Sequence, residues 1–160
     1  MSFHASDPSA LLEATFQRIE RERWAGMPML NPTLAVAAVG FERKENEWRG
    51  VLVTPWGINL LLLPATADWA RPASHERTFR QYAAGSFAFL GNHEDGLGNY
   101  LTCPLIHSVS HFVDQETAVM TARACLIALD MAPPVPEVPP RDPEAPESPA
   151  RRGFFTGQRT

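Results

Sequence analysis

The sequence predicts an α+β protein in which an antiparallel sheet of about five strands is packed by an N-terminal and a C-terminal helix. Apolar residues recur at helical spacing only near the start of the chain and again before residue 131. The stretch between them holds short apolar and β-branched runs separated by turn residues, which is typical of strands. A proline-rich stretch follows, which cannot build a core. We therefore expect one domain over residues 1–131 and a tail over residues 132–160.

Composition excludes several classes of function. A chain of 160 residues can bury one core, and its formal charge of −4 offers no basic face for nucleic acid or an anionic membrane. No apolar run approaches the roughly 20 residues that span a bilayer, so we expect no membrane insertion. The N-terminus lacks the basic start and apolar run of a secretory signal, which favours a cytoplasmic protein. No motif indicates a catalytic residue, a metal or a cofactor.

The first helix is expected from Pro8 to about Trp24. Asp7 followed by Pro8 is typical of an N-cap with proline at the first helical position. The apolar stripe of this helix then falls on Leu12, Phe16 and Ile19.

Three strands in a meander are expected next, at about 33–42, 48–55 and 58–64. The third is apolar on both faces, so it is covered on both, or covered on one and offered to a partner on the other. Pro55 inside a strand pattern indicates an edge or a bulge. Trp56 has the character of an interface anchor, although a tryptophan at a strand end is more often part of the core.

The rest of the domain is expected to hold a surface loop, further strands and the last helix. Residues 65–78 have the composition of a loop, and the strand pattern resumes in RTFRQYAAGSFAFLG and NYLTCPL, which a glycine-rich turn separates. Asp114 is expected to cap the last helix, QETAVMTARACLIALDM.

Cys103, His107 and His111 stand four residues apart and raise the question of a metal site. In a strand, residues four apart are separated by about 13 Å, and in a helix the outer two lie about 12 Å apart, so the three cannot share one ion. A partial site completed by His93 or Asp114 stays open, as does a nucleophilic Cys103. The simpler reading is a cysteine packed in the core, followed by two histidines on a loop.

Four stretches carry a family resemblance: NPTLAVAAVGFERKENEWRGVLVTPWGINLLLLP, GLGNYLTCPLIHSVSHF, the helix start DQETA, and RRGFF. Together they resemble the HybE-type, also called HupJ-type, nickel-iron hydrogenase assembly chaperones, most specifically in TPWGINLLLLP and YLTCPL. The family often has a Ser-Pro step where this chain has His107 and Ser108, which weakens a shared role of the histidines as metal ligands.

The resemblance implies a non-enzymatic accessory protein in the maturation of an uptake hydrogenase. It implies binding of the small-subunit precursor, whose twin-arginine signal peptide directs export, and retention of that precursor until assembly is complete. Other maturation proteins are further possible partners. Such a client calls for an apolar groove or sheet edge with acidic groups near it. The candidate binding residues are Pro55, Trp56, Asn59, Leu60, Leu62, Glu94, Asp95, Cys103 and Asp114.

The end of the tail suggests a second hypothesis. Arg151, Arg152, Phe154 and Phe155 form an R-R-x-F-F pattern similar to the core of a twin-arginine signal, but at the wrong terminus for export. They could imitate the client and occupy its site, or be a basic end with no such role. Two other functions stay open: a thiol- or metal-dependent redox or iron-sulfur accessory protein centred on Cys103 with His107 or His111, and a scaffold that uses the tail as a polyproline ligand.

Overall fold

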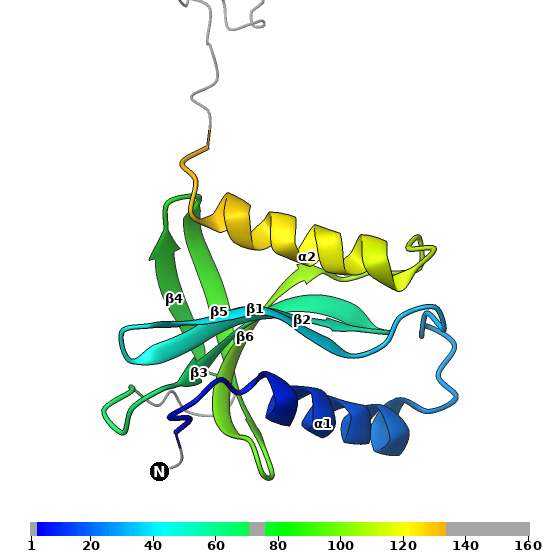
Figure 1. The fold of residues 1–160 in the computed structure, drawn as a ribbon, viewed down its shortest axis with the longest axis horizontal. Coiled ribbons are helices and arrows are strands. Elements are labelled where there is room, and N and C mark those ends of the chain that lie inside the picture. The colour runs from blue at the N-terminus through cyan, green and yellow to red at the C-terminus, as the bar shows by residue number, and fades with distance from the viewer. Residues whose placement is uncertain (1–2, 71–75, 134–160) are drawn as a thin grey trace, which may run out of the picture.

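A computed structural model describes residues 3–70 and 76–133 of the chain. Most of the predicted tail, including its Arg-Arg-Gly-Phe-Phe segment, lies outside the described residues. The described part holds two helices, one of them extended by a π-helical turn, and one sheet (Figure 1). The elements are α1 (Ser9–Ile19), η1 (Glu20–Trp24), β1 (Ala37–Lys44), β2 (Glu47–Thr54), β3 (Gly57–Pro64), β4 (Arg77–Tyr82), β5 (Gly85–Glu94), β6 (Gly98–Ile106) and α2 (Gln115–Leu129).

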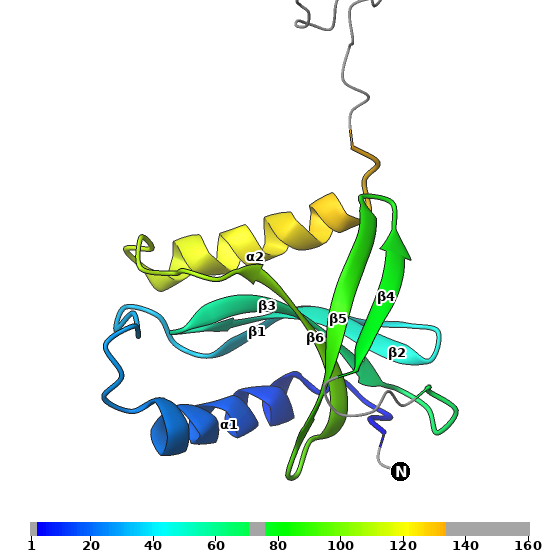
Figure 2. The same cartoon turned by 180° about the vertical axis from the view of Figure 1, so that it is seen from behind.

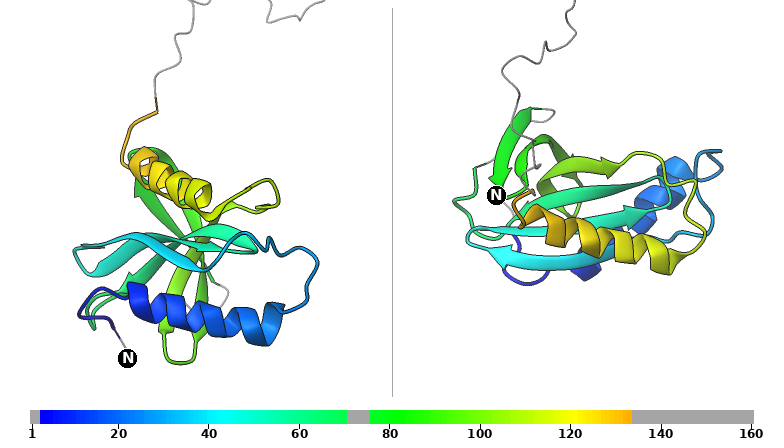
Figure 3. Two further views of the ribbon diagram at one scale, coloured as in Figure 1. Left: turned by 45° about the vertical axis from the view of Figure 1, so that its right-hand side comes forward. Right: turned by 90° about the horizontal axis from the view of Figure 1, so that it is seen from above.

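The α+β class predicted from the sequence is confirmed. The described strands form one antiparallel sheet in the order β1-β2-β3-β6-β5-β4. The helices lie on opposite sides of it, α2 above and α1 below in Figure 1, and the view from behind in Figure 2 agrees. Figure 3 shows the sheet between them from the side and from above. The first predicted helix corresponds to α1 and η1 together.

The sheet has six strands among the described residues, one more than expected. The stretch from Arg77 to Glu94 contains two strands, β4 and β5, because the chain reverses between Tyr82 and Gly85, which are paired. The two residues of this turn are alanines, which are not turn formers. Only Gly85, with a φ of 141°, carries a turn signal.

The expectation that Pro55 marks an edge strand or a bulge is wrong. Thr54 pairs with Gly57, so Pro55 and Trp56 form the two-residue turn between β2 and β3, both of which lie inside the sheet. A proline at a turn needs no ladder partner for its missing N–H. The Thr54 hydroxyl stabilises the turn, because it donates to the Gly57 carbonyl at 2.8 Å and accepts from the Trp56 N–H at 3.3 Å.

The two faces of β3 belong to two different cores. One face packs toward α2 and the other toward α1. Every apolar side chain of this strand is at most 1% exposed, so β3 is covered on both faces. The residues toward α2 are Ile58, Leu60 and Leu62, and those toward α1 are Leu61 and Leu63.

An aspartate lies at the start of each helix, but only Asp114 caps its helix. The Asp114 carboxylate accepts from the Thr117 N–H at 2.8 Å and caps α2, as the sequence predicts. Asp7 is not the cap of α1: Pro8 takes the N-cap position, and the Asp7 carboxylate accepts from the Ser9 N–H at 2.9 Å.

A polar network joins β2 to α2 and β4. The Arg49 guanidinium donates to both oxygens of Asp130, at 3.0 and 2.7 Å, and lies 5.1 Å from the centre of the Tyr82 ring. The hydrogen bond from Arg49 lowers the pKa of the Asp130 carboxyl. Beside it, Glu47 accepts from Trp69 at 2.8 Å and from Arg80 at 3.3 Å. These contacts tie the edge strand β4 back to β2.

Gly50 on β2 should tolerate no larger side chain. A Cβ there would overlap the Phe41 ring. We expect Gly50→Ala to lower the free energy of unfolding by about 1–3 kcal/mol, since overpacking forces neighbouring groups to shift. Urea denaturation followed by circular dichroism measures this. Gly57→Ala is the matched control, because its Cβ would meet the Ile106 carbonyl oxygen at 3.5 Å and the Asn59 Nδ2 at 4.0 Å, both ordinary contacts. Equal stability of the two variants would contradict the packing described.

Candidate partner-binding surface

Helix α1 covers only part of its face of the sheet. It packs against Phe41, Leu52, Leu61 and Tyr100, with its closest approach along β1. The outer part of this face, on β4, β5, the end of β6 and the start of β3, has no helix over it, as the view from behind shows for β4 and β5 (Figure 2). We call this surface the open strip, and it consists of Asn59, Phe79, Ala88, Leu90, Thr102 and Pro104.

The strand register places these residues on one face. Residues directly opposite each other in an antiparallel pair share a face, as do alternate residues of one strand. Leu61 faces α1 and pairs with Thr102, which pairs with Leu90. The other members follow from the pairs Asn59 with Pro104 and Phe79 with Ala88.

The open strip is largely apolar and accessible, with Asn59 and Thr102 as its polar members and the exposed Arg77 of β4 opposite Leu90 on the same face. Phe79 is 62% exposed and Leu90 37%, and Ala88 and Pro104 are also exposed. Contiguous exposed apolar side chains on a sheet typically mark an interaction site. The neighbouring strand β4 is an edge of the sheet, so its outer backbone groups can accept an added strand.

A pair of stacked tryptophans lies at the β3 side of the strip. The rings of Trp24 from η1 and Trp56 from the β2–β3 turn are 4.8 Å apart between centroids and nearly parallel, at 5°. Both side chains are half-buried. Met27 and Met29 follow in the next loop, 41% and 54% exposed. Large aromatic and methionine surfaces of this kind adapt to apolar partners.

An ion pair joins η1 to the C-terminal end of β5. Both terminal nitrogens of Arg23, the residue before Trp24, donate to the Glu94 carboxylate, at 2.8 and 2.9 Å. The hydrogen bond to Glu94 raises the pKa of the Arg23 guanidinium. In the turn between β5 and β6, the Asp95 backbone carbonyl accepts a hydrogen bond from Arg18 of α1 at 3.3 Å. No hydrogen bond or ion pair with another described side chain engages the Asp95 carboxylate.

The residues predicted from the sequence are divided between this surface and the interior. Trp56 and Asn59 lie at the open strip, Glu94 and Asp95 lie near α1 and η1, and Pro55 is buried in its turn. Asp114 is occupied as a helix cap. The other three, Leu60, Leu62 and Cys103, are buried in the core toward α2 and offer little or no surface to a partner in this conformation.

Sequence reasoning missed Trp24, Phe79, Leu90 and Pro104. The alternation of polar and apolar residues in RTFRQY was available as a signal for Phe79. Nothing local indicated that its face would lack a covering helix. The contacts of Trp24 and Arg23 join segments that are far apart in the chain, so sequence spacing did not indicate them.

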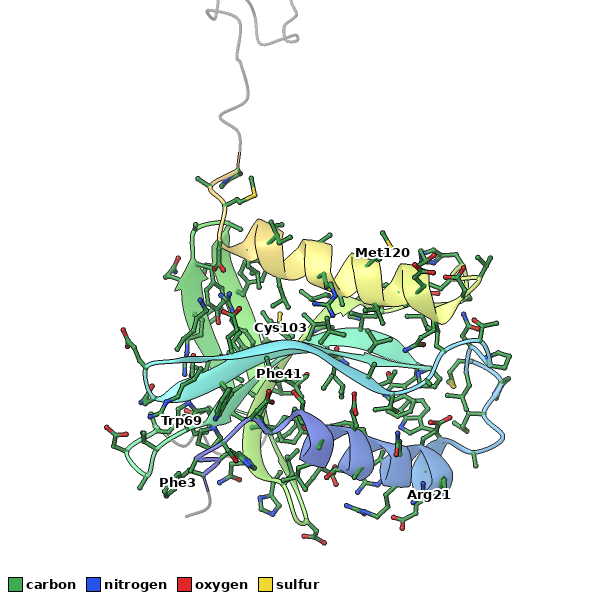
Figure 4. The ribbon with its side chains drawn as sticks, in the orientation of Figure 1. Phe3, Arg21, Phe41, Trp69, Cys103 and Met120 are labelled. Carbon is green, nitrogen blue, oxygen red and sulfur yellow. The ribbon has the colours of Figure 1, made fainter. Side chains whose placement is uncertain are left out.

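The geometry around Cys103 does not favour the thiol-centred alternative. Cys103 lies inside β6, paired with Leu60, and faces the core between the sheet and α2 (Figure 4). Burial raises the pKa of its thiol, which disfavours the thiolate. His107 and His111 are exposed on the following loop, where the His111 ring packs on Phe112. Residues 3–70 and 76–133 contain no group of three or more His, Cys, Asp or Glu side chains able to hold a metal ion.

Comparison with known proteins agrees with the fold. Residues 7–157 match the family model "[NiFe]-hydrogenase assembly, chaperone, HybE". The chain belongs to the HybE family of hydrogenase assembly chaperones. The solution structure of HybE from Escherichia coli is similar to it with a TM-score of 0.68 and 25% identity, over 100% of this chain and 95% of that one.

Two sequence relatives of this HybE family member extend the comparison. The hydrogenase expression/formation protein HupJ of Bradyrhizobium diazoefficiens is 32% identical over 94% of this chain and 88% of its own. The probable rubredoxin HupJ of Rhodobacter capsulatus is 34% identical over 74% of this chain, which covers 43% of the length of that relative. In the described part of the chain, neither helix is long and apolar enough to cross a membrane.

Cys103 should react slowly with thiol reagents. In a Cys125→Ser background, we expect the native protein to react with a disulfide reagent at pH 8 at least about ten-fold more slowly than the urea-denatured protein, because the thiol is buried and its pKa is raised. Absorbance of the released thiolate measures the rate. Fast reaction of the native protein, or a stoichiometric metal ion that is lost on Cys103→Ala, would restore the thiol- or metal-dependent alternative.

Proposed function

We propose that this hydrogenase assembly chaperone binds the small-subunit precursor of a nickel-iron uptake hydrogenase in the cytoplasm. The contact includes the twin-arginine signal peptide and delays export until assembly is complete. The observation that carries the proposal is the open strip, an apolar sheet surface next to an edge strand in a member of a chaperone family. The activity is binding, and no catalytic residue takes part.

The open strip suits an extended apolar peptide. A segment that pairs with the free edge of β4 would lie beside Phe79, whose side chain is 62% exposed. Backbone hydrogen bonds to a sheet edge supply affinity without requiring one sequence, and the side-chain contacts add selectivity. Such low sequence selectivity suits a signal peptide, because its apolar stretch is defined by its composition and not by one exact sequence.

The acidic groups near the strip suit the arginines of such a peptide. Glu94 shares its face of β5 with Leu90 and Ala88, and Asp95 follows in the β5–β6 turn. Carboxylates bind guanidinium groups through two parallel hydrogen bonds, which favours arginine over lysine. An arginine pair followed by apolar residues would therefore meet charge first and apolar surface next along β5.

Substitution on the open strip should weaken precursor binding. We expect Phe79→Ser to reduce affinity for the small-subunit precursor at least about ten-fold, because a large apolar contact is lost. The matched control is Ile127→Ser on the outer side of α2, since Ile127 is 63% exposed against 62% for Phe79 and lies on the opposite face of the sheet. Isothermal titration calorimetry with purified precursor measures both.

Titration with a precursor that lacks its signal peptide tests whether the signal peptide contributes to binding. If the signal peptide contributes, its removal should weaken binding to the wild-type protein and abolish the difference between the Phe79 variant and the wild type. Equal loss in the Phe79 and Ile127 variants would exclude the open strip. No binding of the intact precursor to the wild-type protein would contradict the proposed function as a whole.

The tail is proposed as an internal competitor for the same surface. Arg151, Arg152, Phe154 and Phe155 carry arginines and apolar residues in the order just described, after a proline-rich spacer. A spacer in extended polyproline geometry spans roughly 3 Å per residue, enough to reach any face of a domain this size. Deletion of residues 150–160 should then tighten signal-peptide binding, as measured by fluorescence anisotropy. Unchanged or weaker binding would rule out that the tail occupies the client site.

A further inference from the structure

We propose that Glu94 is the receptor for an arginine of the bound client, and that Arg23 holds this carboxylate until the client arginine displaces it. The inference rests on the proposed function and identifies the residue that would bind the charged part of the client, next to the apolar open strip. The client is a peptide in which apolar residues follow an arginine. Three features of the Arg23–Glu94 ion pair support it.

The first feature is the unequal burial of the two partners. The Glu94 side chain is only 13% exposed, whereas the Arg23 side chain is 54% exposed. The carboxylate therefore lies at the protein surface beneath Arg23, while the guanidinium that covers it is open to solvent. A second guanidinium can reach the same carboxylate once Arg23 moves away, and Arg23 can move into water without crossing the core.

The second feature is the low cost of the exchange. Both side-chain hydrogen bonds of Arg23 within the described residues go to Glu94, so its release breaks no other side-chain hydrogen bond there. A client arginine would replace them with the same bidentate geometry. Ion pairs with an exposed partner contribute little to stability, so the fold does not depend on Arg23 staying bound. Arg23 also lies in η1, a π-helical turn, and such turns recur at functional sites.

The third feature is the alignment of charge and apolar surface on one strand. Glu94, Leu90 and Ala88 alternate along the same face of β5. Four residues of a strand span about 13 Å, so Leu90 lies that far along the strand from Glu94. An extended peptide whose apolar residues follow an arginine by three or four positions matches this spacing. Phe79 on β4 would then extend the apolar contact.

The inference predicts a gain of affinity, which a misfolded variant could not produce. Arg23→Gln leaves Glu94 without its internal competitor, so binding of a signal peptide should tighten roughly two- to five-fold, the range that corresponds to a surface ion pair. Glu94→Gln should weaken binding roughly ten-fold or more, because a charge-assisted bidentate contact is lost. The double variant Arg23→Gln with Glu94→Gln should behave like Glu94→Gln alone.

Arg21→Gln is the control for net charge. It removes the same charge from the same helical segment, but Arg21 is exposed and lies on the side that faces away from the sheet (Figure 4). This variant should bind the peptide as the wild type does. A peptide with lysine in place of both arginines should bind more weakly to the wild type and gain less from Arg23→Gln. Fluorescence anisotropy with a labelled small-subunit signal peptide measures every arm.

The outcomes separate this inference from the proposed function. If the wild type and the Arg23 variant both fail to bind the signal peptide, the proposed role of the signal peptide fails. If the wild type binds but Arg23→Gln has no effect or matches Arg21→Gln, displacement of Arg23 is excluded while the proposed function stands. A Glu94→Gln variant that binds as tightly as the wild type overturns the inference.

Discussion

The burial of β3 on both faces is the constraint on which the rest of the structure depends. A central strand with five apolar side chains at 0–1% exposure requires a layer on each side of the sheet. Helix α2 supplies one layer and α1 the other. A helix is about 10–12 Å wide, whereas six strands spaced about 4.8 Å apart form a broader sheet, so neither helix covers all six strands. The uncovered remainder of the α1 face is therefore a consequence of how the core is built.

The same constraint decides which residues are available to a partner. Leu60, Leu62 and Cys103 contribute to the core between the sheet and α2, so they stabilise the fold and are not open to a partner. The side chains that reach the surface come from the margins of the sheet, the β2–β3 turn and the end of the first helix. A chaperone gains from this separation, because a partner can bind and leave without disturbing the buried strand.

The contacts that frame the open strip are of the kind that can change partners. The tryptophan stack and the Arg23–Glu94 ion pair each have one partner in η1, where the helix leaves its regular α-helical geometry, and those partners, Trp24 and Arg23, are partly or well exposed. They hold the end of the first helix against the sheet with modest energy. Reversible association requires modest energies, since a partner bound too tightly could not be released.

The sequence by itself determined the fold class, the two helices, the Asp114 cap and the doubly apolar third strand, because periodicity and capping are local properties of the chain. It did not reveal the turn between β4 and β5, whose two alanines carry no turn signal. For the candidate surface, it indicated Trp56, Asn59, Glu94 and Asp95, but it could not separate them from the buried Leu60, Leu62 and Cys103. Exposure depends on which face a helix covers, and Arg23 meets Glu94 across 71 positions of sequence. Only the tertiary structure decides such matters, because they follow from how far each helix extends over the sheet.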